Sequence, residues 1–192
     1  MMEPLILASA SPRRRKLLSR IGIPYEPYPA DVDESTCLPA REAVVLLSRR
    51  KAEASLQAHP GRWILGADTL VSLEEQILGK PSDPEDACRM LRLLSGRTHQ
   101  VYTGVTVITP RGEVFTDVDA SDVTFASLSE REIRAYVATG EPLDKAGAYA
   151  IQGGAAQWIR HMEGSPSGVI GLPLYEVRQL LTRAGYFDEN SL

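Results

Sequence analysis

The stretch at residues 5–18, LILASASPRRRKLL, constrains the fold of this chain more than any other. An apolar run passes through small residues into Ser11 and Pro12. Serine is a favoured helix N-cap and proline a favoured first helical residue, so a strand should turn directly into a helix here. A strand followed at once by a helix is typical of α/β folds.

The first turn of this helix carries an unusual charge. Residues 13–16 read Arg-Arg-Arg-Lys, although the positive end of the helix dipole disfavours cations and leaves backbone N–H groups unpaired. A bound anion would resolve both conflicts. Phosphate fits, because a helix N-terminus supplies aimed N–H donors and arginine supplies planar, bidentate ones. The alternative is a solvated basic turn beside a core strand.

The overall charge limits what this anion can be. The 192-residue chain has a formal net charge of -4, with 43% hydrophobic and 24% charged residues, as in ordinary globular proteins. General affinity for a nucleic acid polymer would need a more basic protein, so the partner of the basic turn should be small. The length fits one domain. We expect it over residues 1–188, with residues 189–192 as a frayed tail.

Cysteine usage and hydropathy narrow the class further. Cys37 and Cys88 lie far apart, with no histidines at zinc spacing, which argues against a disulfide framework and a zinc site. No window approaches a membrane span, and no basic segment precedes the first apolar run as a signal peptide would require. We therefore expect a cytoplasmic protein that does not bind a membrane.

The rest of the chain mixes helical and extended patterns. Cap residues and apolar periodicity predict helices at residues 40–58, 83–96, 129–139 and 174–184. Runs rich in Val, Thr, Tyr and Phe predict strands at residues 70–73, 76–78, 99–109, 113–126 and 157–163. We interpret GSPSG at residues 164–168 as a loop. Strands without strict alternation with helices indicate a mixed sheet.

Asp68 is the first candidate for catalysis. An apolar run at residues 63–67 stops at this residue, in WILGADT. Such a run is typical of a buried strand whose end delivers a carboxylate into a cleft, where ligands bind in α/β sheets. The alternative is an aspartate that caps a turn with its side chain.

Two further segments carry polar candidates. Asp31, Asp33 and Glu34 cluster in one loop, which suits a divalent metal opposite a phosphate site but also fits a solvated acidic loop. Gln152 lies in a segment of small residues, and its amide can both donate and accept, as recognition of a base edge requires. A tight structural turn explains Gly153 and the glycine after it equally well.

Taken together, the segments resemble the Maf family of nucleoside triphosphate pyrophosphatases. The resemblance rests on LASASPRRRKLL (7–18), VDE (32–34), LGADTLV (65–71), GKP (79–81), LSGRTHQVYTGV (94–105), DKAGAYAIQG (144–153) and VIGLPLYEV (169–177). It covers nearly the whole chain. It implies a two-lobed Maf/ITPase-like α/β fold, with a mixed, twisted central sheet flanked by helices and a cleft between the lobes, and it suggests a homodimer.

The resemblance also implies roles for individual residues. The catalytic acid of the family falls on Asp68. Its other site positions hold the expected residue types: phosphate-binding Ser9, Arg13 and Arg14, acidic Glu34, basic Lys51 and Lys80, and Thr69 and Gln152, which with Arg13 are tied to substrate choice. Glu34 and Asp68 are then the candidates to hold a divalent cation such as Mg²⁺ or Mn²⁺.

Two residues select a branch within the family. One branch, similar to 7-methyl-GTP pyrophosphatases, has GSDQ and a glutamate, whereas the branch that acts on dTTP and UTP has GADT and a glutamine. This chain has GADT and Gln152. We therefore expect hydrolysis of dTTP and UTP, or their modified forms, to the monophosphate and pyrophosphate. The alternatives are the same chemistry on another base, and a nucleotide-binding regulator of cell division and septum formation with little turnover.

Overall fold

A computed structural model describes residues 3–187, so the predicted tail at residues 189–192 lies outside the described residues. The chain forms a seven-stranded sheet in the order β2-β1-β3-β5-β6-β7, with β4 on β3. The strands are β1 (Leu5–Ala8), β2 (Tyr25–Pro27), β3 (Ile64–Leu73), β4 (Gln76–Leu78), β5 (Thr98–Ile108), β6 (Val114–Phe125) and β7 (Ile159–Glu163). β1 pairs parallel with β2 and β3, and all other pairs are antiparallel. The prediction of a mixed sheet is confirmed.

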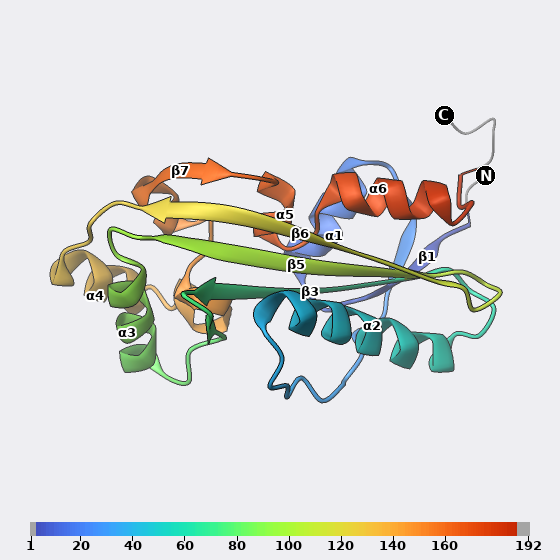
Figure 1. The fold of residues 1–192 in the computed structure, drawn as a ribbon, viewed down its shortest axis with the longest axis horizontal. Helices are drawn as coiled ribbons and strands as arrows, with labels where there is room; N and C mark the ends of the chain where they lie inside the picture. Colours follow the sequence, from blue (N-terminus) through green and yellow to red (C-terminus); the bar gives the residue numbers. More distant parts are fainter. Residues whose placement is uncertain (1–2, 188–192) are drawn as a thin grey trace.

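Helices cover both faces of this sheet. They are α1 (Pro12–Arg20), α2 (Ala40–Ala58), α3 (Pro84–Leu94), α4 (Glu130–Ala138), α5 (Pro166–Ile170) and α6 (Leu174–Arg183), with 3₁₀ turns η1 (Glu141–Asp144), η2 (Ala146–Ala148) and η3 (Gly154–Trp158). Figure 1 shows α2 along one face and α1, α5 and α6 over the other, with α3 and α4 at the end of the sheet far from both termini. Within residues 3–187, no helix combines the length and the apolar character needed to cross a membrane.

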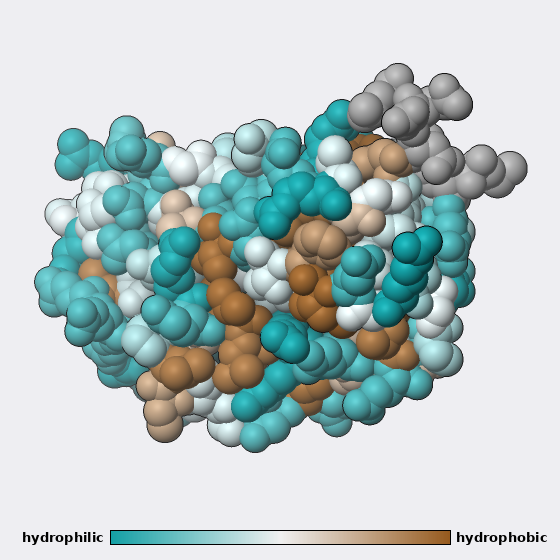
Figure 2. Space-filling model, turned by 45° about the vertical axis from the view of Figure 1, so that its right-hand side comes forward, coloured by the Kyte–Doolittle hydropathy of each residue, from teal (hydrophilic) through white to brown (hydrophobic). Residues whose placement is uncertain are grey.

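Hydrophobic residues are also present at the surface of one face of the molecule. On the face drawn in Figure 2, hydrophobic residues appear as separate patches among hydrophilic ones, as on most globular proteins. The large hydrophobic side chain with the greatest exposure among the described residues is Tyr175, near the start of α6.

The predicted helix starts are confirmed at three caps and missed at a fourth. Ser11 caps α1, Asp83 caps α3, and Ser129 begins α4 with a complete capping box. The prediction of a loop at GSPSG is wrong, because Ser165 Oγ accepts from the N–H of Gly168 and starts α5. The missed signal is a serine followed by proline, the same pair that begins α1.

The prediction that a strand ends at Asp68 is also wrong, because β3 continues to Leu73. It does so because it pairs with β5 along almost its whole length and then turns back as β4. On the opposite edge of β3, however, pairing with β1 stops at Gly66 and pairing with β4 begins at Val71. Asp68 and Thr69 therefore lie at a gap in this edge, which the strand pairs of the described residues leave open.

Two glycines let α2 lie very close to the sheet. A Cβ at Gly66 would come within 2.3 Å of the carbonyl oxygen of Ser48, and one at Gly104 within 2.3 Å of that of Val44. Neither position therefore has room for a side chain. Gly66 and Asp68 point to the same face of β3 because side chains alternate along a strand. The close packing thus brings α2 near Asp68.

The opposite face of the sheet carries two hydrophobic clusters. Leu65 and Val105 belong to the cluster that contains residues of α1 and α6, whereas Val71 and Val101 belong to the cluster that contains residues of α3 and α4. These residues form alternating apolar rows on β3 and β5. Both rows are interrupted at their midpoints, by Thr69 on β3 and by Thr103 on β5.

Candidate active site

A cleft of about 860 Å³ opens at the gap in β3, within the size range of small-molecule sites. Its lining includes every site residue predicted from the sequence: Ser9, Arg13, Arg14, Glu34, Lys51, Asp68, Thr69, Lys80 and Gln152. These residues come from six separate stretches of the chain. The fold therefore brings together the whole predicted set.

The cleft is basic although the chain is acidic. Among the described residues, the lining has five basic side chains, Arg13, Arg14, Lys51, Lys80 and Lys145, and three acidic ones, Glu34, Asp68 and Asp144. The formal charge of the lining is thus positive, whereas the chain carries -4. A concave site with this charge attracts anions. Arg15 and Lys16, the remainder of the basic turn, do not line it.

Lys51 joins the two candidate metal-binding carboxylates. Its Nζ lies 2.5 Å from Asp68 Oδ1 and 2.7 Å from Glu34 Oε1. The side chains of Lys51 and Asp68 are only 11% and 9% exposed, but that of Glu34 is 54% exposed. Partial burial alone would raise the pKa of Glu34, but its hydrogen bond to Lys51 and the charge of Lys51 lower the pKa overall.

The two carboxylates fit a divalent cation. Within residues 3–187, no three histidine, cysteine or acidic side chains form a complete ligand cluster. Asp68 and Glu34, however, converge on a single ammonium group, which places their oxygens around one positive charge. Mg²⁺ is commonly bound by one or two carboxylates together with phosphate oxygens of a substrate and water. This donor set suits such an ion.

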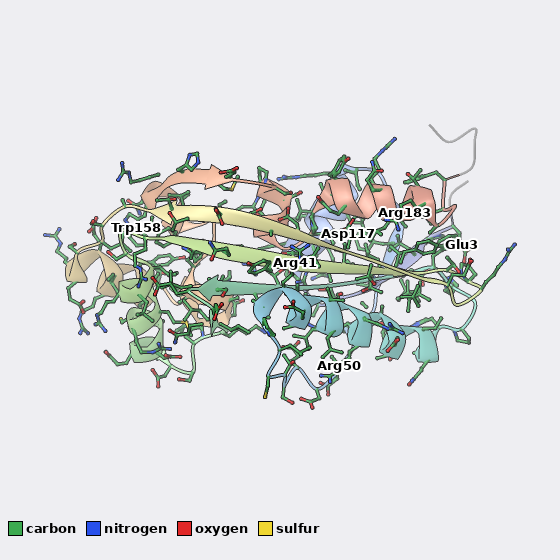
Figure 3. The ribbon with its side chains drawn as sticks, in the orientation of Figure 1. Glu3, Arg41, Arg50, Asp117, Trp158 and Arg183 are labelled. Carbon is green, nitrogen blue, oxygen red and sulfur yellow. The ribbon has the colours of Figure 1, made fainter. Side chains whose placement is uncertain are left out.

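The backbone around Glu34 is tied to α2. Arg50 Nη1 donates to the carbonyl oxygens of Asp33, at 2.9 Å, and Ser35, at 3.2 Å. Figure 3 shows Arg50 on the side of α2 where this loop runs. Asp33 Oδ1 also accepts from the backbone N–H and the hydroxyl of Ser35. Arg50 therefore holds the residues on both sides of Glu34.

Arg14 is held in one orientation by three hydrogen bonds. Its guanidinium donates from Nε to the carbonyl oxygen of Gly171 at 2.7 Å, from Nη1 to Ser9 Oγ at 3.2 Å and from Nη2 to Thr69 Oγ1 at 3.2 Å. Burial lowers the pKa of Arg14, and the nearby charge of Asp68 opposes that shift. A guanidinium has five N–H hydrogens, so two are left for a ligand in the cleft.

Ser9 is a hydrogen-bond donor available to a ligand. Its buried hydroxyl oxygen accepts from the backbone N–H of Ser11 at 3.1 Å and from Arg14 Nη1. Because both protein contacts use the oxygen as acceptor, the hydroxyl hydrogen can point into the cleft. Ser9 and Arg14 together offer donors to the oxygens of a phosphate.

Gln152 lies on a segment whose backbone is held by hydrogen bonds to two side chains. Tyr136 Oη accepts from the N–H of Ala150 at 3.2 Å, and Glu141 Oε2 accepts from the N–H of Gly154 at 2.9 Å. A Cβ at Gly153 would lie 2.0 Å from Glu141 Oε1, so the carboxylate of Glu141 would have to move to make room for a side chain there. The side chain of Gln152 is itself exposed in the cleft.

Buried side chains support the same segment from the far side. His99 is fully buried and its Nε2 lies 2.8 Å from Tyr149 Oη. Burial lowers the pKa of His99 to about 4, so the imidazole is neutral at neutral pH. Both rings also pack edge to face with Phe125. The segment that carries Gln152 therefore packs, through Tyr149, against a buried cluster that contains His99 and Phe125.

Sequence reasoning missed several parts of this site. Thr103 lies behind Thr69, and the carbonyl groups of Gly168 and Gly171 accept hydrogen bonds in the same network. Lys145 lines the cleft beside Asp144. Backbone carbonyls carry no residue-type signal. Thr103, by contrast, interrupts an alternating row of valines, and that polar interruption could have marked it.

Comparison with known proteins assigns the family. The model of the family described as Maf-like protein matches residues 4–184, and the chain belongs to this family. The dTTP/UTP pyrophosphatase of Moorella thermoacetica is 50% identical over 96% of both chains, and that of Geotalea uraniireducens is 52% identical over 96% of both. Among solved structures, the Ham1 protein of Staphylococcus aureus is 16% identical, with a TM-score of 0.49 over 65% of this chain and 72% of that one.

Proposed function

We propose that this protein is a nucleoside triphosphate pyrophosphatase that hydrolyses dTTP and UTP to the monophosphate and pyrophosphate. The observation that carries the proposal is the basic cleft in which the nine predicted residues meet. Relatives of about 50% identity over nearly the whole chain bear the name dTTP/UTP pyrophosphatase, which supports the same choice of substrate.

The cations of the cleft suit the negative charge of the reaction. When water attacks the α-phosphorus, the bond to the oxygen that bridges α and β phosphorus breaks, and charge develops on the departing pyrophosphate. Arg14 presents two unused N–H hydrogens from a fixed guanidinium, and Arg13, Lys51 and Lys80 add positive charge. Fixed donors aimed at developing charge are a major source of catalysis.

Asp68 is the group best placed to act on the attacking water. It is buried at the gap in β3 and held by Lys51, so its carboxylate has one well-defined position. In this role it takes a proton from water as the oxygen bonds to phosphorus. Glu34 and Asp68 would hold Mg²⁺ or Mn²⁺, which would supply charge neutralisation on the triphosphate.

Gln152 is the residue we assign to base selection. It is exposed at the edge of the cleft on a segment that the protein anchors from two sides. Its amide can donate and accept at the same time, as an edge of uracil or thymine requires. A glutamate here would lose the donor and would favour a base that presents N–H groups.

Product analysis over a nucleotide panel tests the proposal. dTTP, UTP, CTP, ATP, GTP and 7-methyl-GTP are supplied with Mg²⁺ or Mn²⁺, and pyrophosphate and orthophosphate are measured separately. We expect pyrophosphate, preferentially from dTTP and UTP. Orthophosphate would indicate a different phosphohydrolase, and tight binding without turnover would indicate a nucleotide-binding regulator.

A further inference from the structure

Two threonines face each other at the boundary between the two hydrophobic clusters. Thr69 on β3 and Thr103 on β5 are direct partners in the antiparallel register, and their hydroxyl oxygens lie 2.9 Å apart. Thr103 has no exposed surface. Valine has nearly the same shape as threonine and would continue both apolar rows, so shape alone does not call for hydroxyl groups here.

The direction of the hydrogen bonds in this pair is fixed by counting hydrogens. Thr103 donates its only hydroxyl hydrogen to the carbonyl oxygen of Gly168, at 2.8 Å. A threonine hydroxyl has one hydrogen, so towards Thr69 it can only accept. Thr69 therefore donates to Thr103, and the oxygen of Thr69 accepts from Arg14 Nη2. One directed chain runs from the guanidinium through both hydroxyls to the carbonyl group.

This series of hydrogen bonds and the direct bond from Arg14 both end at the same helix, α5. The carbonyl oxygen of Gly171 accepts from Arg14 Nε, and that of Gly168 accepts from Thr103. Gly168 lies within α5, and Gly171 is the residue that ends it. Two connections therefore fix the orientation of the guanidinium relative to α5. One is the direct hydrogen bond to Gly171, and the other runs through the hydroxyl groups of Thr69 and Thr103 to Gly168.

We propose that Thr103 is a positioning residue that fixes the Arg14 guanidinium through Thr69. A corollary is that the hydroxyl hydrogen of Thr69 is committed to Thr103, so Thr69 influences substrate choice through the orientation of Arg14 rather than by donating to the base. This inference rests on the proposed function, since it takes Arg14 to bind the triphosphate.

The decisive variant is Thr103→Val, which keeps the shape of the side chain but removes the acceptor for Thr69 and the donor for Gly168. Each of the two lost hydrogen bonds joins neutral groups, so we expect kcat for pyrophosphate release from dTTP to fall about 3- to 10-fold. Thr103→Ser keeps the hydroxyl and should restore most of the rate.

Thr106→Val is the matched control. Thr106 lies on the same strand and is equally buried, but it faces α2, where its hydroxyl contacts Ser48 Oγ at 2.9 Å and Thr116 Oγ1 at 3.3 Å. It lines no part of the cleft. The Thr106→Val variant should be somewhat less stable than the wild type and should have the same kcat. Equal losses of kcat in Thr106→Val and Thr103→Val would contradict the proposal.

A double-mutant cycle separates positioning from general structural support. In an Arg14→Ala background, Thr103→Val should lower kcat no further, because the group that it positions is gone. A full additional loss in that background would overturn the proposal. If Thr103→Val does not fold, Thr69→Val breaks the same chain at its partly exposed end, and the same cycle with Arg14→Ala applies.

Failure of the proposed function gives a different result. A wild-type protein that releases no pyrophosphate refutes the pyrophosphatase assignment, whereas a wild-type rate matched by Thr103→Val refutes only the positioning role. If the wild type binds dTTP without turnover, the same variants are compared by the Kd for dTTP. The affinity should then fall with Thr103→Val, stay unchanged with Thr106→Val, and show the same non-additivity with Arg14→Ala.

Discussion

The two walls of the cleft differ in how tightly their polar groups are held. The inner wall, Ser9, Arg14, Asp68 and Thr69, is largely buried, and each of its side chains has at least one hydrogen-bond partner in the protein. The outer wall, Glu34, Lys80 and Gln152, is exposed. Within residues 3–187, the side chains of Lys80 and Gln152 make no hydrogen bond, and Glu34 is held only by Lys51.

This difference suggests a division of labour. Groups that act on developing charge work best when they are fixed before the substrate arrives, because no energy is then spent on reorganising them. Groups that admit a metal or distinguish a base must exchange partners during binding, and exposed side chains do so at low cost. We therefore expect the main effect of changes at Asp68 and Arg14 to be a lower rate, and that of changes at Glu34 and Gln152 to be an altered metal dependence or base preference.

The largest effect should come from Asp68→Asn. The amide keeps the shape but cannot accept a proton from water, and it loses the ion pair with Lys51. We expect kcat to fall roughly 10²- to 10⁴-fold, as for loss of a general base. Steady-state pyrophosphate release measures this, with the circular dichroism spectrum as the folding control. A kcat within threefold of wild type would contradict the role of Asp68 as the general base.

Arg14→Lys should come next, with kcat lowered about 10²-fold, as for loss of a fixed donor at developing charge. Lysine keeps the charge but cannot bond in one plane to Gly171, Ser9 and Thr69. Arg15→Lys, one residue further along the same helix and outside the cleft, is the control. Similar kcat values for the two variants would argue against a fixed guanidinium.

The stability of the protein should fall in acid because of His99, which is buried beneath the segment that carries Gln152. His99 has a pKa of about 4 in the folded protein against 6.5 for the ordinary group, so the unfolded chain binds more protons between these values. Stability should therefore fall as the pH drops from 6.5 to 4, by about 3 kcal/mol in total, at 1.36 kcal/mol per pKa unit. Urea unfolding across this range measures it.

The matched variant for this effect is His99→Gln, which does not titrate in this range and can still bond to Tyr149. The difference in unfolding free energy between wild type and variant isolates the contribution of His99 from that of the carboxyl groups. A difference that stays constant from pH 7 to pH 4 would show that the buried imidazole does not govern the acid sensitivity.

Gln152→Glu should change the preference rather than the maximum rate. We expect the ratio of kcat/KM for dTTP to that for GTP to fall about tenfold, because one base contact is lost. The ratio is read from pyrophosphate release. Gln179→Glu introduces the same charge at an exposed position of α6 outside the cleft and should leave the ratio unchanged.

The smallest effect should come from Arg50→Gln, which frees the backbone on both sides of Glu34. Loss of exposed hydrogen bonds of about 0.5–1.5 kcal/mol each should weaken Mn²⁺ binding severalfold and leave kcat at saturating metal unchanged. Titration of Mn²⁺ by electron paramagnetic resonance gives the affinity directly. Arg49→Gln, whose arginine pairs with Glu53 on the same helix, is the control.

The sequence predicted the contents of the cleft better than the way its residues are held. Caps such as Ser11 and Ser129 are local signals that act within four residues, so the helix starts could be predicted. The site residues carried a family pattern, and all of them line the cleft. The continuity of β3 from Asp68 into the predicted strand at residues 70–73 could not be predicted in the same way, because it depends on pairing with residues of β5 that lie 28 to 34 residues away.

The contacts that hold Arg14 were the feature of the site that was hardest to predict from the sequence. Arg14 donates to the carbonyl oxygen of Gly171, which ends α5, and Thr103 donates to that of Gly168 within α5, a segment that we predicted to be a loop. Thr103 carries a polar group at a position where valine would pack equally well, and its meaning depends on Thr69 lying opposite it. Such relations between distant residues appear only once the register of the sheet is known.

The division between the two walls is tested most directly by one ratio, that of kcat/KM for dTTP to kcat/KM for GTP, measured in Asp68→Asn and in Gln152→Glu. Asp68→Asn should lower both values by the same large factor and keep the ratio, whereas Gln152→Glu should change the ratio and largely keep kcat for the favoured substrate. A changed ratio in Asp68→Asn together with an unchanged ratio in Gln152→Glu would contradict the account.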